Sequence, residues 1–359
     1  MFEYFLTNKN NWLSAKGPES EIVFSSRVRL ARNLEGFLFA SKASSAQKKE
    51  ILSKMQSIYK DIEKLKGSAF VKRGDISDID GQFLLERHLV SRELIAESKN
   101  NKGIIISNDE RISIMVNEED HLRMQVMASG FDLKNCWRIL NEIDNDLSRK
   151  VKFSFSSDLG YLTACPTNVG TGFRASCMLH LPALVFTKRI NKILELLARI
   201  SFTTRGLFGE GTQALGNFFQ ISNQVSLGLS EEELIDNLIG VVNQIKDQEI
   251  DARDTLVKKF KLNLEDNIWR ALGLLRNSRL ITTKEALGHL STLSLGLDLG
   301  IIKGSDFSVS EDGKGLINSL FIIIQPAHLQ KIESKSLKGA QRDYVRSEIL
   351  RKKLGGKDV

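Results

Sequence analysis

RISIMVNEEDHLRMQ, residues 111–125, decides the fold, because a run of strand-forming residues passes directly into a cluster of charges. Together with GIIIS (103–107) just before it, the run predicts a β-hairpin. If the strand simply continued, Glu118 and Asp120 would lie on its apolar side and Glu119 on the other. One group would then be buried without compensation, so we expect the run to leave the sheet or to meet cations.

Further strand and helix patterns surround this hairpin. Strands are predicted at KFSFSS (152–157), YLTACP (161–166), SFTTRGLF (201–208) and FFQISNQ (218–224). A helical period from Ser45 to Gly67 predicts an amphipathic surface helix. The expected fold class is therefore α+β, with a mostly antiparallel sheet backed by helices.

The pattern changes after Gly228. Ser230 and Glu233 form a capping box, and the residues that follow have helical period with few strand signals. We therefore expect a first domain of mixed strands and helices at residues 1–256 and a helical C-terminal domain at 257–359.

Composition limits the class of protein. The chain has 359 residues, of which 42% are hydrophobic, enough for one large domain or two ordinary ones. Its three cysteines show no CxxC spacing, which argues against a disulfide framework or structural zinc and favours a reducing compartment. The start of the chain lacks a signal-peptide pattern, and the longest apolar run, LHLPALVF (179–186), is too short to cross a bilayer. We expect a cytoplasmic protein without a membrane segment.

The charge balance points to an anionic partner without identifying it. The net charge is +7 and the pI is near 9.2. Nucleotides, nucleic acids and acidic proteins all fit such a surface.

Two arginines alternate in IVFSSRVRLARN (22–33), where strand geometry places Ser25, Arg27 and Arg29 on one face. A half-buried strand with a solvated polar face is the commoner explanation of an isolated Arg-x-Arg. The alternative is a clamp for phosphate oxygens, because guanidinium offers a fixed fork of donors.

A first glycine-rich segment, CPTNVGTGFRAS (165–176), follows a predicted strand and leads into a helical pattern beginning near Phe173. Amides around Gly170 and Gly172 would meet an anion at such a helix start, although an ordinary strand-to-helix turn fits equally well. The segment is neither a Walker A loop nor GxGxxG. Arg174 in a first helical turn opposes the helix dipole unless an anion is bound, which favours a ligand.

A second glycine-rich segment, RGLFGEGTQALGN (205–217), sets Glu210 between two glycines. An exposed hairpin loop is the usual explanation, and a closing flap that carries a carboxylate is the alternative. Acids combined with several arginines suit a cationic group held by carboxylates together with a polyphosphate held by guanidinium groups.

Four segments in this order, SSRVRLARN, NEEDHLRMQ, CPTNVGTGFRAS and RGLFGEGTQALGN, resemble the signature of the guanidino (phosphagen) kinase family, with a match over residues 20–255. Details such as GNFFQISNQ and LGLDLGIIKG are similar to the bacterial protein-arginine kinase branch along essentially the whole chain.

The resemblance implies roles for particular residues. Glu119 would be the catalytic carboxylate, Glu210 a second carboxylate, and Cys165 a reactive cysteine beside the guanidine, although a free cysteine is otherwise usually a small buried apolar residue. The residues implied to bind ATP are Ser26, Arg27, Arg29, His121, Arg123, Arg174 and Arg205. We expect His121 to have a structural or nucleotide-side role rather than to act as a base. The implied cofactors are ATP and Mg²⁺, the metal held mainly by the phosphates and by no protein site.

QRDYVRSEI (341–349) resembles the family's RDxxRA element, which binds phosphoarginine away from the active site. Arg342, Asp343 and Arg346 match that element, and the two arginines share a helix face. Ser347 stands where the family has alanine. Without the resemblance, a basic solvated helix would be the preferred explanation.

The implied function is a protein-arginine kinase that transfers the ATP γ-phosphoryl group to arginine residues in proteins, marking them for Clp-type degradation or regulating a repressor. The chain reaches SSRVR by residue 25, without the helical N-terminal domain of the metabolic kinases, which leaves room for an arginine presented by a protein. The implied partners are protein substrates with exposed arginine, a zinc-binding activator, a Clp chaperone and a second copy of the chain, with no direct nucleic acid. The alternatives are a kinase of free arginine or another small guanidine, and a non-catalytic phosphoarginine or nucleic-acid binding protein.

Overall fold

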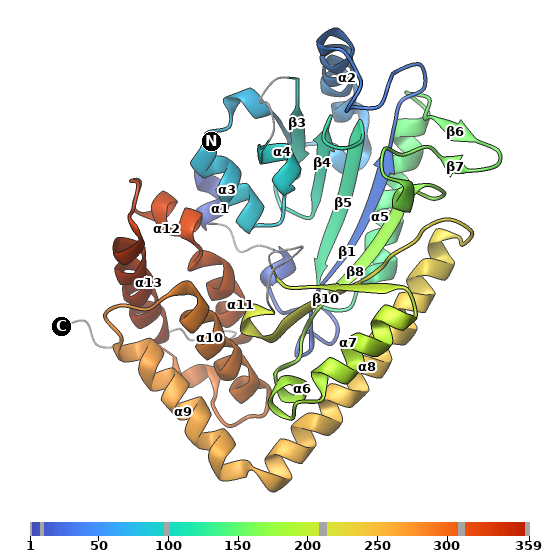
Figure 1. Ribbon diagram of the computed structural model, residues 1–359. Helices are drawn as coiled ribbons and strands as arrows, with labels where there is room; N and C mark the ends of the chain where they lie inside the picture. Colours follow the sequence, from blue (N-terminus) through green and yellow to red (C-terminus); the bar gives the residue numbers. More distant parts are fainter. Residues whose placement is uncertain (1, 8–10, 97–100, 208–213, 308–312, 356–359) are drawn as a thin grey trace. The chain divides into compact units, whose positions relative to one another are not determined.

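The computed structural model describes residues 2–7, 11–96, 101–207, 214–307 and 313–355 (Figure 1). The strands are β1 (Val23–Arg32), β2 (Ala69–Lys72), β3 (Gly103–Ile106), β4 (Ile112–Val116), β5 (Leu122–Ser129), β6 (Phe155–Ser156), β7 (Gly160–Tyr161), β8 (Phe173–His180), β9 (Phe202–Arg205) and β10 (Phe218–Asn223). The helices are α1 (Glu3–Thr7), α2 (Ser45–Ile58), α3 (Asp78–Glu86), α4 (Arg92–Ala96), α5 (Leu133–Ser148), α6 (Pro182–Phe186), α7 (Ile190–Arg199), α8 (Glu231–Lys259), α9 (Lys261–Asn277), α10 (Thr283–Asp298), α11 (Gly313–Ile323), α12 (Pro326–Ile332) and α13 (Gly339–Leu354).

Hydrogen bonds order the strands β2-β3-β4-β5-β1-β8-β10-β9, and β6 pairs separately with β7. The pairs β2/β3, β3/β4, β4/β5 and β1/β5 are all antiparallel. The predicted hairpin is confirmed, because β3 and β4 pair with Gly103 opposite Val116. The expected α+β class, an antiparallel sheet with helices followed by a helical C-terminal region, is confirmed.

Contacts divide the chain into two compact units. The sheet unit comprises Ser25–Cys177 and Ser222–Gly240, and the C-terminal unit comprises Met1–Phe24, Met178–Ile221 and Val241–Val359. The chain therefore passes from one unit to the other within β1, β8, β10 and α8. These units do not follow the expected division at residue 256, which stays a prediction.

In the sheet unit, α5 packs along β5 through an apolar face that includes the fully buried Leu140 and Ile143. A buried ion pair joins β1 to the same helix, since Arg32 donates to both carboxylate oxygens of Asp144 at 2.8–3.2 Å. The Arg32 guanidinium also lies 3.5 Å from the centre of the Tyr161 ring. Apolar burial and a fully paired charge together fix this face of the sheet.

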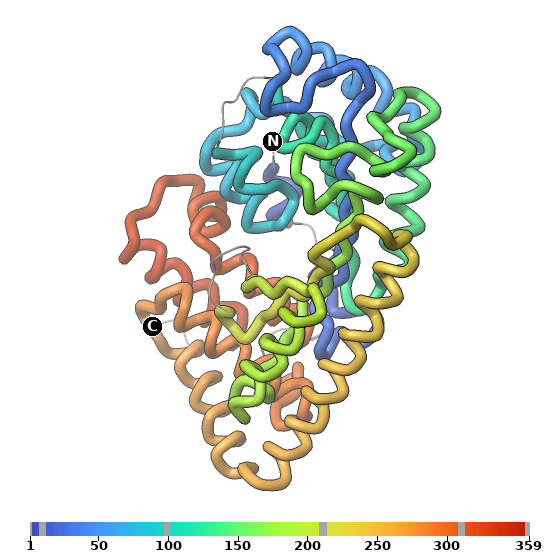
Figure 2. The backbone as a smooth tube through the Cα atoms, turned by 45° about the vertical axis from the view of Figure 1, so that its right-hand side comes forward, coloured from blue at the N-terminus to red at the C-terminus, as the bar shows by residue number. Residues whose placement is uncertain are grey.

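In the C-terminal unit, α10 packs against α9 and α11, and α13 packs against α9. Figure 2 shows these helices as the orange to red part of the tube. The aromatic rings of Phe24, Phe218 and Phe321 meet edge to face in its core. No helix among the described residues is both long and apolar enough to span a bilayer.

Three expectations were wrong, wholly or in part. The segment from Phe173 is a strand, β8, rather than a helix, because Phe173, Ala175 and Cys177 alternate into the core. YLTACP holds only the end of the short β7 instead of a buried strand. The predicted helix from Ser45 ends at Ile58 and continues to Leu65 as two 3₁₀ turns.

Candidate active site

The acidic segment is the turn between β4 and β5. Asn117 takes a left-handed conformation (φ 58°), and its N–H donates to the carbonyl of His121 at 2.9 Å, which closes the turn. Glu119 is exposed at its tip, whereas Glu118 and Asp120 are buried. The acidic run therefore leaves the sheet, which is one of the two ways, predicted from the sequence, of avoiding an uncompensated buried carboxylate.

The buried carboxylates of Glu118 and Asp120, which flank Glu119 in the sequence, each have their own hydrogen-bond partners. Glu118 accepts hydrogen bonds from Arg123 (2.7 Å), from the hydroxyl of Ser91 and from the N–H of Glu119 (3.0 Å). Burial opposes ionisation of Glu118, but Arg123 and these hydrogen bonds outweigh it and lower the pKa. Asp120 accepts from Asn33 and from the Ala164 N–H, both at 2.7 Å, although burial still raises the pKa of its carboxyl.

Glu119 differs from its neighbours. Among the described residues, its carboxylate forms no hydrogen bond or ion pair. Partial loss of water, followed by repulsion from Asp120 and Glu118, raises the pKa of the Glu119 carboxyl. A carboxylate that is accessible and more basic than usual is suited to accept a proton.

Cys165 is tied to the acidic turn through Asp120. The N–H of Ala164, directly before Cys165, is the donor that Asp120 accepts. Cys165 is half-buried, and its Sγ lies 3.1 Å from the Thr167 hydroxyl. The structure therefore brings the segments of Glu119 and Cys165 together.

Three of the predicted phosphate-binding arginines share one face of the sheet. Arg123 lies opposite Ala31 in the β1/β5 register, and Ala31 is on the face of Arg27 and Arg29. Arg29 is buried and the other two are half-buried.

Arg174 lies at the start of β8, beside the end of β1. The carbonyl of Gly172 accepts from the Ala31 N–H (2.9 Å), and the Arg174 guanidinium contacts the Ser222 hydroxyl (3.1 Å). The expected helix dipole does not act on Arg174, because no helix begins here. Gly172 instead allows close packing, since a Cβ would lie 2.6 Å from the Ala31 oxygen at φ +65°.

Ser26 and His121 make internal hydrogen bonds. Ser26 is fully buried; its hydroxyl donates to Gly130 O (2.8 Å) and accepts from the Asp132 N–H (2.9 Å). His121 accepts at Nδ1 from the Leu34 N–H (3.0 Å) and donates from Nε2 to Leu38 O (2.8 Å). That pattern requires a neutral imidazole, and burial lowers the His121 pKa accordingly.

The structure does not bring all predicted residues into one unit. Arg205 ends β9 in the C-terminal unit, and Glu210 lies outside the described residues. Among the residues that are described, no cluster of three or more His, Cys, Asp or Glu side chains is arranged to hold a metal ion.

The predicted phosphoarginine element lies on α13. Arg346 is 1% exposed and donates to the carbonyls of Ile324 (2.9 Å) and Ile281 (2.8 Å) and to the Asp343 carboxylate (2.5 Å). Arg342 is half-buried. Ser347 uses its additional hydroxyl to donate to Arg279 O (2.7 Å).

Sequence reasoning missed several supporting residues. Asn33 is the last residue of IVFSSRVRLARN, but no sequence pattern predicted its hydrogen bond to Asp120. Ser91 and Ser222, which contact Glu118 and Arg174, gave no signal because their partners are distant along the chain.

An arginine-bearing sheet face next to an accessible, basic carboxylate has the features of a phosphotransferase site. The family model for the ATP:guanido phosphotransferase C-terminal catalytic domain matches residues 50–252, and the model for the protein-arginine kinase McsB C-terminal domain matches residues 261–358.

Curated relatives and solved structures are also guanidino kinases. The protein-arginine kinase of Desulforamulus reducens is 45% identical over 96% of this chain and 95% of the relative, and that of Halothermothrix orenii is 42% identical over 97% and 98%. The duplicated taurocyamine kinase of Schistosoma mansoni, with bound transition-state analog components, aligns with a TM-score of 0.59 and 28% identity over 66% of this chain and 34% of that one. A lombricine kinase aligns with a TM-score of 0.57 and 25% identity over 64% and 67%.

The chain is thus a guanidino phosphotransferase, an enzyme class that takes its phosphoryl group from ATP. It belongs to the protein-arginine kinases of the ATP:guanido phosphotransferase family.

Proposed function

We propose that the enzyme transfers the γ-phosphoryl group of ATP to a terminal guanidino nitrogen of arginine residues in proteins. The observation that carries this proposal is the accessible Glu119 carboxylate, held between two anchored acids beside an arginine-bearing strand. Protein-arginine kinase relatives along nearly the full chain support the choice of a protein substrate.

Proton removal is the first requirement. A guanidinium group has a pKa above about 12 and is not nucleophilic while protonated, so a carboxylate must orient it and accept its proton. Glu119 takes this proton as a guanidino nitrogen forms the N–P bond and the bond from phosphorus to the ADP oxygen breaks. Glu210 holds the opposite edge of the planar group, and Cys165 lies beside it.

Charge neutralisation is the second requirement. Arg27, Arg29, Arg123, Arg174 and Arg205 would surround the phosphates, with Ser26 and His121 supporting their strands. Mg²⁺ would be held mainly by the phosphates, where it neutralises charge on the transferring group. Glu118 then has a second role, because its ion pair with Arg123 fixes one guanidinium relative to the base.

Regulation and partners extend the proposal. Arg342, Asp343 and Arg346 would form a phosphoarginine site on α13, separate from catalysis, in which the buried Arg346 holds the Asp343 carboxylate in place. A homodimer, a zinc-binding activator, a Clp chaperone and a role in protein degradation or repressor control follow from the family resemblance.

Mass spectrometry without acidic work-up tests the reaction, because the N–P bond is acid-labile. After incubation with ATP and an arginine-rich protein, we expect phosphoryl groups on arginine side chains. Free arginine offered in parallel distinguishes the substrates: phosphorylation of free arginine alone would favour a small-guanidine kinase. Salt-dependent DNA binding without ATP consumption would favour a nucleic-acid binding protein.

A further inference from the structure

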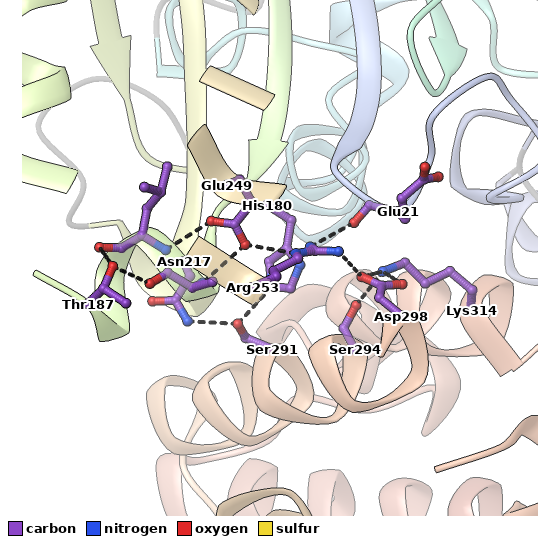
Figure 3. Close-up of polar contacts among 12 residues, drawn as sticks. Glu21, His180, Thr187, Asn217, Glu249, Arg253, Ser291, Ser294, Asp298 and Lys314 are labelled. Atoms are coloured by element: carbon purple, nitrogen blue, oxygen red, sulfur yellow. Dashed lines mark hydrogen bonds and ion pairs between the residues drawn. The ribbon is translucent and has the colours of Figure 1, made fainter. Parts of the chain in front are cut away.

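A buried polar network in the C-terminal unit joins three helices to the ends of three strands (Figure 3). The helices are α8, α10 and α11, and the strands are β1, β8 and β10. Two of these strands carry proposed phosphate-binding arginines further along: Arg27 and Arg29 lie on β1 and Arg174 lies on β8.

Ser291 is the centre of the network on α10. It is fully buried, and its Oγ accepts a hydrogen bond from Asn217 Nδ2 (2.8 Å) and lies 2.8 Å from His180 Nε2. Asn217 immediately precedes β10 and takes a left-handed conformation (φ 59°). Its carbonyl accepts from the Leu181 N–H (2.9 Å), so one hydroxyl connects the end of β8 to the start of β10.

His180 is neutral in this environment. Burial, and then the positive charges of Lys314 and Arg253, lower its pKa well below the usual range. Its ring lies 4.9 Å from that of Phe218, and among the described residues its Nδ1 has no hydrogen-bond partner. The contact with Ser291 is therefore the polar contact that orients the imidazole.

Arg253 on α8 connects the network to the start of β1. Its guanidinium donates to Glu21 O (3.1 Å), just before β1, and pairs with Glu249 (2.9 Å) and Asp298 (3.4 Å). Glu249 in turn accepts from the Ala183 N–H (3.1 Å), just beyond β8. Every charged member has an opposite charge within reach, as a persistent buried network requires.

Gly216 adds a close backbone approach at the same place. Its φ is +65°, and a Cβ would lie 3.3 Å from the carbonyl oxygen of Leu287 on α10. The segment before β10 is thus seated on α10 by packing as well as by the hydrogen bond from Asn217.

We infer that Ser291 is a positioning residue for phosphoryl transfer: through Asn217 and His180 it fixes the ends of β10 and β8. This inference rests on the proposed function. Ser291 lies within the stretch matched by the McsB C-terminal domain model, residues 261–358. The C-terminal helical domain accordingly takes part in the catalytic architecture, in addition to any binding role of α13.

The test compares Ser291→Ala with Ser294→Ala. Ser294 is equally buried on the same helix, but its hydroxyl accepts from Lys314 (2.7 Å) rather than from a strand end. For Ser291→Ala we expect kcat to fall roughly tenfold to a hundredfold, with KM for ATP unchanged, because small displacements of reacting groups are costly. Ser294→Ala should lower the Tm comparably and leave kcat near wild type.

Asn217→Gly removes the same hydrogen bond from the other side and tolerates the left-handed backbone. It should reproduce the fall in kcat, and the double variant with Ser291→Ala should be no worse than either single variant. If Ser291→Ala does not fold, the kcat of Asn217→Gly tests the inference in its place.

Three results would overturn the inference. They are a wild-type kcat in Ser291→Ala or in Asn217→Gly, an equal fall in Ser294→Ala, and multiplicative losses in the double variant. If the wild-type enzyme transfers nothing to arginine, the proposed function fails and the inference fails with it; an active wild type with equally active variants removes the inference alone.

Discussion

Replacing Glu119 by glutamine removes one charge from the tip of the acidic turn and changes little else. The two side chains have the same shape. The bonds that hold the turn use the Glu119 N–H, Glu118 and Asp120 rather than the Glu119 carboxylate. Glu119→Gln should therefore keep its fold and its affinity for ATP.

The rate of transfer should fall by about two to four orders of magnitude, the usual cost of losing an essential base. That loss corresponds to about 2.7–5.5 kcal/mol of transition-state stabilisation. The wild-type rate should fall as the pH decreases through the raised pKa of Glu119, because protonation removes the base. In the variant, this acidic limb should be absent.

The assay is the initial rate of acid-labile phosphoryl transfer from ATP to an arginine-rich protein, with ATP affinity measured separately. Glu142→Gln is the matched control, since Glu142 is a surface carboxylate on α5 of the same unit. A Glu119→Gln enzyme that phosphorylates arginine near the wild-type rate would refute the assignment of the base.

Three further perturbations test the fold and the second site. Arg87→Ala leaves the buried Glu110 carboxylate without its 2.6 Å partner, so unfolding free energy from urea titration should drop by about 3–5 kcal/mol; a drop below about 1 kcal/mol would contradict it. Gly172→Ala should destabilise by about 1–3 kcal/mol because of its positive φ and the Ala31 carbonyl, whereas Gly240→Ala, an exposed helical position with open space, should stabilise by about 0.5–1 kcal/mol. Arg342→Ala should weaken phosphoarginine binding in a calorimetric titration and leave catalysis largely intact; unchanged binding would remove this site.

Local patterns predicted much of the fold. The hairpin of β3 and β4 followed from apolar runs around a polar turn, and the start of α8 from Ser230, which accepts from the Glu233 N–H. The helix expected after Phe173 failed, because β8 lies between two strands and is buried on both faces. In FRASCMLH the buried Phe173, Ala175 and Cys177 recur at every second position, which is the period of a strand, and pairing with β1 and β10 fixes that structure.

The site was predictable in its residue types but not in its connections. Alternation correctly grouped Arg27 with Arg29. Alternation also placed Arg32 on the opposite face, with Val28 and Leu30, but nothing local paired it with Asp144, its partner in a buried ion pair. Partners that lie a hundred residues apart become visible only when the chain has folded.

The repeated passage of the chain between the two units constrains how the protein is made. The sheet unit needs Ser222–Gly240, and the C-terminal unit needs both the first residues and the last. During synthesis from the N-terminus, the sheet unit cannot be completed until α8 has begun to leave the ribosome. Met1–Phe24 is synthesised first, but it packs in a unit that also contains the residues synthesised last. Newly synthesised enzyme should thus remain inactive, and vulnerable to proteases, until translation is nearly finished.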